Sequence, residues 1–223
     1  MTDGDGLARI TDEVTSCRAC PRLVAWRERV AQDRRAAYRD WEYWGRPVPG
    51  FGDPAAAVAI VGLAPAAHGA NRTGRMFTGD RSGDFLYAAL HRTGFASQPT
   101  SEQRGDGLTL TGCWVTAAVR CAPPQNRPHP DERDRCAPFL QRELGALPVA
   151  VLVALGGFAW DVLARVLGPV RPKPRFGHGA TARLGDLTML GSYHPSQQNT
   201  FTGRLTPAML DAVFTQARDL ARG

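Results

Sequence analysis

The chain has 223 residues, of which 43% are hydrophobic and 22% charged, a composition that fits one globular domain over residues 1–223. No segment approaches the roughly 20 apolar residues of a membrane helix. The N-terminus has neither the basic start nor the apolar run of a signal peptide, so we expect a cytoplasmic protein. The net charge of +6 fits a polyanionic partner such as nucleic acid, and equally a generally basic surface.

Four short apolar runs predict buried strands. They are rich in Val, Ile and Leu with little alternation, which is typical of parallel strands covered on both faces. The strands are expected at 56–63, 113–120, 149–155 and 187–193, and helices at 84–93, 130–146, 158–167 and 207–221. This alternation predicts an α/β fold, a three-layer α/β/α sandwich around a four-stranded, mainly parallel sheet. Ligands of such folds bind beyond the carboxyl ends of the strands, so the loops after the first, second and fourth strands are the candidates for function.

Four of the five cysteines are spaced like the ligands of one site: Cys17, Cys20, Cys121 and Cys136. Four thiolates can hold zinc or an iron–sulfur cluster, and the spacing does not separate the two. Scattered structural cysteines are the alternative. A shared site would dock the N-terminal segment, residues 1–50, on the loop after the second strand, which indicates a structural role. Cys113 lies inside a predicted strand and is expected in the core.

Three motifs carry a resemblance to a known family: GLAPAAHGANRTGRMFTGD at 62–80, VRCAPPQNRP at 119–128 and HPSQQNTFTGRLT at 194–206. They resemble the motifs of the family 5 uracil-DNA glycosylases, relatives of the family 4 iron–sulfur enzymes. The match runs from Cys17 to the final helix and includes the four cysteines in order. The first and third motifs together make the resemblance specific.

The resemblance implies an α/β/α sandwich with a [4Fe–4S] cluster on the four cysteines. It also implies removal of uracil, and of other deaminated bases, from DNA as the first step of base excision repair. Such enzymes extrude the nucleotide into a pocket, because the glycosidic bond is out of reach inside a stacked duplex. Lys173, the only lysine, lies in a Pro-rich stretch that indicates a surface loop. We therefore expect an abasic site without strand scission. We also expect a monomer.

Hydrolysis of an N-glycosidic bond builds negative charge on the departing base, which calls for a hydrogen-bond donor. His194 is predicted to donate an imidazole N–H to the base; a histidine that only satisfies the strand end is the alternative. Phe77 is predicted to stack on the extruded base, with a plain core role as the alternative. Further base contacts are expected from Gly62, Leu63, Ala64, His68 and Asn71.

The residue that acts on the attacking water is less clearly indicated. Family 4 enzymes carry Glu directly after the first glycine of the first motif, where this chain has Leu63. Asp80 is the nearest carboxylate in the same loop and is predicted to take the catalytic role, with Asn71 and Asn126 as polar alternatives. Asp80 can instead cap the helix that starts near Gly83.

Specificity and DNA contacts follow from the same motifs. Family 4 enzymes read the uracil edge with an Asn in the second strand, where this chain has Ala117, so we expect activity on hypoxanthine and xanthine as well as uracil. Arg204 and Leu205 are predicted to enter the helix as a wedge, or else to cover the final helix. The remaining DNA contacts are expected from Arg72, Arg75, Arg81 and Ser196.

The segment 34–44 mixes basic and aromatic residues, and we expect Trp41 and Trp44 to pack against the sheet rather than to stack on DNA. Two other functions fit the composition: an iron–sulfur protein that binds lesions without cutting, and a zinc-stabilised α/β hydrolase of nucleotides. His194 and Phe77, within their motifs, disfavour the first. The second would be colourless, unlike a protein that holds an iron–sulfur cluster.

Overall fold

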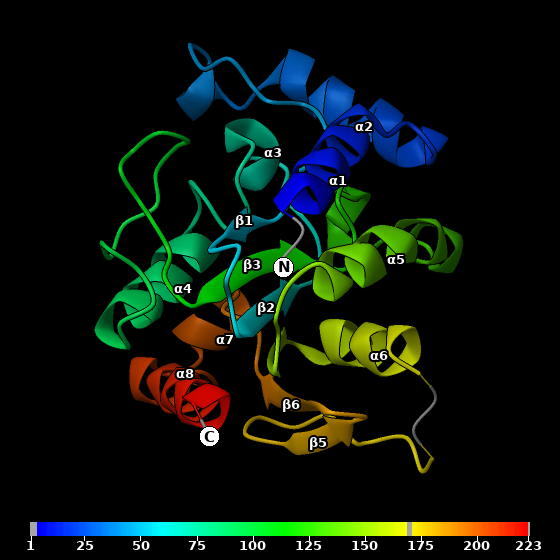
Figure 1. The fold of residues 1–223 in the computed structure, drawn as a ribbon. Coiled ribbons are helices and arrows are strands. Elements are labelled where there is room, and N and C mark those ends of the chain that lie inside the picture. The colour runs from blue at the N-terminus through cyan, green and yellow to red at the C-terminus, as the bar shows by residue number, and fades with distance from the viewer. Residues whose placement is uncertain (1–3, 169–170, 223) are drawn as a thin grey trace.

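The computed structural model describes residues 4–168 and 171–222, which form a central sheet with helices on both faces (Figure 1). The sheet has six strands in the order β1-β3-β2-β4-β6-β5. The strands are β1 (Phe51–Gly52), β2 (Val58–Gly62), β3 (Cys113–Ala117), β4 (Val151–Leu155), β5 (Thr181–Leu184) and β6 (Leu187–Ser192). The helices are α1 (Gly4–Ser16), α2 (Pro21–Asp33), α3 (Ala70–Thr73), α4 (Arg81–Arg92), α5 (Pro130–Gly145), α6 (Gly157–Val166), α7 (Gln197–Phe201) and α8 (Pro207–Arg222), with 3-10 turns η1 (Ala36–Tyr38) and η2 (Pro124–Asn126).

The predicted sandwich is confirmed, and the four predicted strands are its parallel centre. β3, β2, β4 and β6 are neighbours in that order, and each pair is parallel. The predicted strand count is wrong at the edges, where β1 pairs antiparallel with β3 and β5 pairs antiparallel with β6. Neither edge strand forms an apolar run: β1 has two residues, and β5 has one buried residue in four. Both therefore escape a search for buried strands.

Two apolar cores fill the space between the layers. Val58 and Ile60 of β2 belong to the core under α4 and α8, where Leu86 and Phe214 pack. The alternate residues of the strand, such as Val61, face the core under α5 and α6. Figure 1 shows these two helix pairs on opposite sides of the sheet. Side chains that alternate between two covered faces explain why the central strands read as continuous apolar runs.

The N-terminal helices lie along one end of this sandwich. α2 starts at Pro21, which suits the first helical position because proline has no N–H to leave unpaired. α1 packs against α5, where Glu13 pairs with Arg142 at 2.5 Å. Trp44 packs on the core beside the sheet, as expected, whereas the Trp41 ring lies 4.1 Å from the guanidinium of Arg72 and belongs to neither core. Within residues 4–168 and 171–222, no helix combines the length and apolarity that crossing a bilayer requires.

Candidate active site

A cavity of about 350 Å³ lies where the loops after β2, β3 and β6 leave the carboxyl edge of the sheet. This is the edge to which the parallel strands were expected to bring the functional loops. Its walls hold these predicted residues: Leu63, Ala64, Phe77, Asp80, Asn126, His194 and Ser196. Pro65, Ala66, Met76, Ser82 and Gln198 complete the lining, and of these Met76, Ser82 and Gln198 were not expected from the sequence.

Phe77 is held in the cavity wall by close contact with glycine. A Cβ at Gly62 would lie 2.6 Å from Cζ of Phe77, and a Cβ at Gly83 would lie 1.8 Å from its carbonyl oxygen. Phe77 itself has φ 52, a backbone conformation that costs a side-chain-bearing residue of the order of 1–3 kcal/mol. Its ring centroid lies 5.8 Å from that of His194, with the planes tilted by 34°. The two rings therefore border the same space.

His194 leaves the sheet directly after β6 and is fixed through its backbone. Its carbonyl oxygen accepts a hydrogen bond from Asn199 Nδ2 at 2.9 Å. Gly156 has φ 94, and a Cβ there would lie 3.3 Å from Cβ of His194. A glycine at this position therefore avoids a tight contact with the histidine side chain. Burial lowers the pKa of His194 to about 4. The imidazole is therefore neutral near pH 7 and keeps one N–H to donate.

Asp80 both caps a helix and faces the cavity. Its Oδ1 accepts from the Gly83 N–H at 3.0 Å, so the capping interpretation is confirmed at the start of α4. Its Oδ2 rests against Gly69, where a Cβ would lie 1.9 Å away. Burial raises the pKa of this carboxyl, against the effect of the backbone N–H groups of Gly83 and Ser82. The hydrogen bond to Oδ1 and the contact of Oδ2 with Gly69 thus fix the orientation of the carboxyl in the cavity wall.

Asn126 reaches the cavity from a turn with unusual backbone geometry. Asn126 and the preceding Gln125 have φ 56 and 55, so two successive residues with side chains lie in the left-handed region. Such conformations persist where the surrounding structure holds them, and they concentrate at functional sites. The amide of Asn126 offers both a donor and an acceptor to a molecule in the cavity.

The structure contradicts the expected phosphate contact of Arg72. This side chain is 4% exposed. It donates from Nε to the His68 carbonyl and from Nη2 to the Gly79 carbonyl, each at 2.8 Å. The rings of Tyr38 and Trp41 lie 4.0 and 4.1 Å from its guanidinium carbon. Arg72 therefore stabilises the loop from inside and offers no free guanidinium to DNA.

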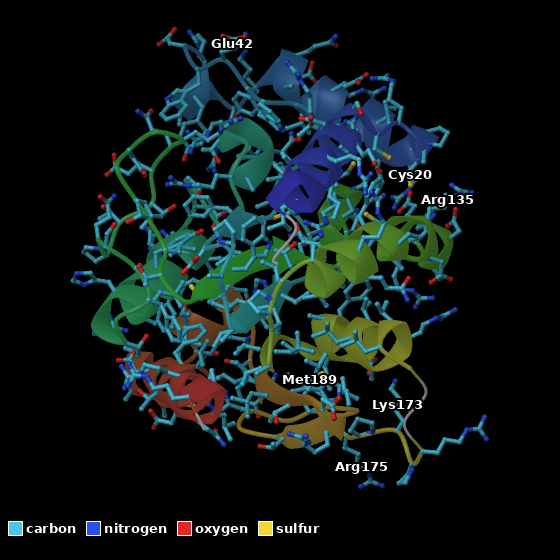
Figure 2. All side chains as sticks on the ribbon, in the orientation of Figure 1. Cys20, Glu42, Arg135, Lys173, Arg175 and Met189 are labelled. Carbon is cyan, nitrogen blue, oxygen red and sulfur yellow. The ribbon has the colours of Figure 1, made fainter. Side chains whose placement is uncertain are left out.

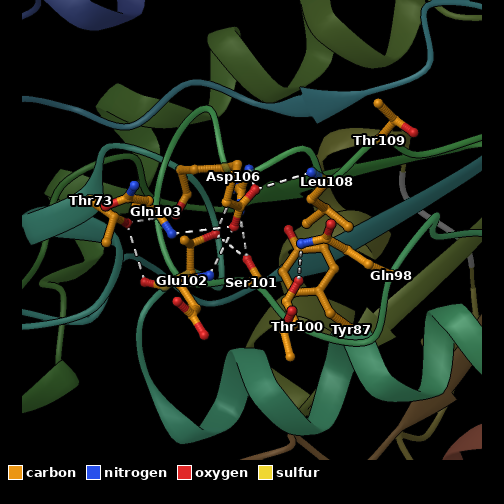
Figure 3. Close-up of polar contacts among 12 residues, drawn as sticks. Thr73, Tyr87, Gln98, Thr100, Ser101, Glu102, Gln103, Asp106, Leu108 and Thr109 are labelled. Atoms are coloured by element: carbon orange, nitrogen blue, oxygen red, sulfur yellow. Dashed lines mark hydrogen bonds and ion pairs between the residues drawn. The ribbon is translucent and has the colours of Figure 1, made fainter.

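Arg75 is corrected for the same reason, being 5% exposed. It pairs with Asp106 at 2.6 Å and donates to Ser101 Oγ at 3.0 Å. Asp106 in turn organises the loop 97–109 by accepting hydrogen bonds from the backbone N–H groups of Glu102, Gln103 and Leu108, as Figure 3 shows. Arg75 thus anchors the loop 97–109 to the loop 62–80, which lines the cavity and is called the cavity loop.

The predicted wedge pair also needs correction. Leu205 is 1% exposed and belongs to the core, so its side chain is not presented at the surface as a wedge. Arg204 is exposed, with its guanidinium carbon 4.5 Å from the Tyr193 ring. The exposed apolar residue of this loop is Phe201 at the end of α7, which is 69% exposed and lies 5.4 Å from the guanidinium of Arg81. Which apolar residue faces outward depends on α7, a helix that the sequence did not indicate.

Two other predicted base contacts lie outside the cavity lining. His68 Nδ1 lies 3.1 Å from the Tyr43 hydroxyl. Asn71 is fully buried and donates from Nδ2 to the Arg27 carbonyl at 3.3 Å. Neither side chain belongs to the lining, and Gly62 contributes the support under the Phe77 ring instead.

The four spaced cysteines line a second, small cavity between the N-terminal helices and α5: Cys17, Cys20, Cys121 and Cys136. Arg27 Nη1 donates to Cys121 Sγ at 3.0 Å, and the Arg120 N–H donates to Cys136 Sγ at 3.3 Å. Figure 2 shows Cys20 close to Arg135 at this place. In the described residues, no group of three or more His, Cys, Asp or Glu side chains is arranged to hold a metal ion. Cys113 is buried in β3, as expected.

Comparison with known proteins gives a consistent set of matches. Residues 49–218 match the model of the uracil DNA glycosylase superfamily. A type-5 uracil-DNA glycosylase of Mycobacterium tuberculosis is 58% identical over 212 residues, which cover 93% of this chain and 79% of the relative. Type-5 enzymes of Mycobacterium leprae and Thermus thermophilus are 56% and 54% identical; the matches cover 99% and 93% of this chain, and 99% and 95% of those relatives.

The state of His194 can be tested by NMR titration, with a His194→Gln variant to assign its signals. We expect a neutral imidazole down to a midpoint near pH 4. Because this value lies below the ordinary 6.5, the folded protein binds fewer protons than the unfolded chain, and it should lose stability as the pH falls from 6.5 towards 4. A midpoint near 6.5 would contradict the buried, neutral state.

Proposed function

This chain belongs to the uracil-DNA glycosylase superfamily, and from that premise we propose that it hydrolyses the N-glycosidic bond of uracil in DNA. The observation that supports this most directly is one cavity lined by an aromatic ring, Phe77, and a buried imidazole, His194, whose pKa is lowered by burial. A base that has left the stack needs a π surface and a donor for its developing negative charge. Such repair acts on the chromosome, so we also propose a cytoplasmic location.

The chemistry divides between the base and the sugar. The C1′–N bond breaks with its electron pair on the base, and the His194 N–H stabilises the anion at a carbonyl oxygen. A water molecule adds to C1′ and loses a proton. We assign that proton to the Asp80 carboxylate or, through it, to solvent, with Asn126 orienting the water or the base edge. Because the buried carboxyl has a raised pKa, it is a better proton acceptor than an exposed one.

The cavity also suits deaminated purines. Uracil, hypoxanthine and xanthine share a carbonyl beside a ring N–H, which an amide such as that of Asn126 can pair irrespective of ring size. Ala117 is buried opposite Gly62 in the sheet and offers no amide to select uracil. We therefore propose release of hypoxanthine and xanthine alongside uracil.

The reaction stops at the abasic site. Cutting the strand by an enzyme-bound imine requires an amine, and Lys173 is the only lysine. It is exposed, pairs with Asp161 at 2.8 Å, and lies outside the cavity lining. Figure 2 places it on the loop after α6, away from α3 and α7.

We further propose that the four cysteines hold a [4Fe–4S] cluster. The fit rests on the donor set: four cysteines around one cavity, with Arg27 and the Arg120 N–H donating to two of the sulfurs. A cluster binds each thiolate to a different iron, so its ligands stand further apart than those of one zinc ion. When bound, the cluster would link the N-terminal helices to the rest of the fold.

DNA contacts are proposed at the rim of the cavity. Phe201 replaces Leu205 as the wedge, because it is the exposed apolar side chain of the loop that carries His194. An apolar wedge offsets part of the stacking lost when a base leaves the helix. Arg81 and Arg204 are exposed beside aromatic rings and are placed to meet phosphates, with Ser196 nearer the base.

Base release from labelled oligonucleotides tests the activity. We expect release from strands that hold uracil and hypoxanthine, and none from undamaged DNA. His194→Ala should lower the single-turnover rate by about 10²–10³-fold, the usual cost of losing one donor to a developing anion. His91→Ala, on the exposed surface of α4, is the control. No release from any lesion while DNA is still bound would indicate a lesion-binding protein, and release of uracil alone would refute the wider specificity.

The cofactor can be tested by anaerobic purification. We expect a brown protein that absorbs near about 400 nm and holds about four irons per chain. Cys121→Ala should lose the colour and unfold at a lower temperature, because ligation contributes to folding. Cys113→Ala, which lies outside the site, should keep the colour. A colourless protein that contains zinc would overturn the cluster assignment.

The wedge assignment predicts different effects for two residues of one loop, one on the rate of base release and one on the stability of the fold. Phe201→Ala should slow release from duplex DNA by about tenfold and change release from single strands less, since single strands have less stacking to replace. Leu205→Ala should instead lower the stability of the fold by about 2–5 kcal/mol. Equal rates of Phe201→Ala and wild type on duplex DNA would exclude the wedge.

A further inference from the structure

Arg27 of α2 is a buried charge without a buried carboxylate. It is 2% exposed. The nearest carboxylate, Glu28, lies 3.8 Å away and is itself bonded to Arg18. The partners of the guanidinium are instead Cys121 Sγ at 3.0 Å and the Cys17 carbonyl at 3.3 Å, while its Nε has no hydrogen bond within the described residues. An isolated buried cation is costly, and an anionic thiolate site beside it supplies the missing counter-charge.

The backbone of the same residue holds the loop that forms the substrate cavity. The Arg27 carbonyl accepts from Asn71 Nδ2 at 3.3 Å, and the Ala67 carbonyl lies 3.4 Å from the same nitrogen. Only the amide nitrogen can face two carbonyl oxygens, so the chemistry fixes the orientation of this side chain. Asn71 is fully buried in α3, and its hydrogen bond joins α3 to α2.

The segment after α2 adds two backbone hydrogen bonds to the same helix. The Gly45 N–H donates to the Asn71 carbonyl at 3.0 Å, and the Trp44 N–H donates to the Arg72 carbonyl at 2.9 Å. α3 lies within the loop 62–80, which also carries Phe77 and Asp80 in the cavity wall. Arg27, which contacts Cys121, and the segment after α2 thus both hold the loop that lines the cavity; Figure 1 shows α3 beneath that segment.

We propose that Arg27 and Asn71 couple the cysteine site to the substrate cavity. The Arg27 guanidinium fixes α2 on the cysteines, and Asn71 fixes the cavity loop on α2. Neither touches the base, so both are positioning residues. Loss of the cluster removes the counter-charge of Arg27 and loosens the loop that holds Phe77 and Asp80. This inference rests on the proposed cluster and the proposed glycosylase activity.

Four variants of the full chain, purified with the cluster, test separately the contact of Arg27 with the cysteine site and the contact of Asn71 with α2. Arg27→Met removes the charge and the N–H···S bond, and Arg27→Lys keeps the charge. Asn71→Ala removes the bond to α2. Thr93→Val is the control, because it removes another buried side-chain hydrogen bond, to the Ala89 carbonyl at 2.8 Å, at the far end of α4. The measurements are the reduction potential of the cluster, hydrogen–deuterium exchange of residues 63–80, and kcat and KM for uracil release.

Arg27→Met should shift the reduction potential to a more negative value, since a positive charge and a hydrogen bond to sulfur both favour the reduced cluster. It should also speed exchange in residues 63–80, and Arg27→Lys should restore part of the potential. Asn71→Ala should keep the potential, speed exchange in the same residues, and lower kcat/KM by about tenfold, the effect of one lost buried hydrogen bond. Thr93→Val should change none of these quantities.

Wild-type exchange in residues 63–80 and wild-type kcat/KM in Asn71→Ala would overturn the coupling, as would a wild-type potential in Arg27→Met. If Arg27→Met does not take up the cluster, Arg27→Lys and Asn71→Ala decide by the same measurements. Failure of the proposed function is distinct: the wild type itself would then lack base release or the cluster, whereas the exchange of Asn71→Ala still reports on the link to α2.

Discussion

Parallel pairing of four buried strands is the constraint on which the site depends. The pairing of Gly62 with Ala117, and of Leu155 with Ser192, brings the ends of β2, β3, β4 and β6 to one edge of the sheet. Every loop that lines the cavity leaves the sheet at this edge. Because the strands are apolar on both faces, a slip by one residue would exchange the residues of the two cores. The register that stabilises the fold therefore also places Phe77, Asn126 and His194 around one space.

Burial of the site then acts on its two titratable groups in a matched way. It lowers the pKa of His194 and raises that of Asp80, so both shifts favour the neutral form. A neutral imidazole can donate a hydrogen bond from its N–H to the departing anion and still keep that proton. A carboxyl with a raised pKa holds the proton of a water more readily once that water has added to the sugar. If the nucleobase departs before the water adds, the sugar cation attracts the water by itself. The Asp80 carboxylate then needs to be only a weak proton acceptor.

The sequence was informative where local pattern decides the outcome, and misleading where packing decides. Apolar runs predicted the parallel strands, and the spacing from Asp80 to Gly83 indicated a helix cap. Arg72 and Arg75 looked like phosphate contacts because exposure is the usual state of arginine; their burial depends on Tyr38, Trp41 and Asp106, which are distant in sequence. The edge strands gave no such apolar run, and α1 and α2 were not predicted although their buried apolar residues recur at helical spacing. The outward position of Phe201 depends on α7, a helix of five residues.

The central claim is that uracil extruded from DNA binds between Phe77 and His194. A crystal structure of the His194→Ala variant bound to a duplex with one uracil tests it most directly, because the weakened chemistry keeps the base attached. We predict the uracil ring against Phe77 within the cavity after β2, with Phe201 in the gap left in the duplex. A uracil that remains stacked, or that binds at a different face of the sheet, would contradict the claim.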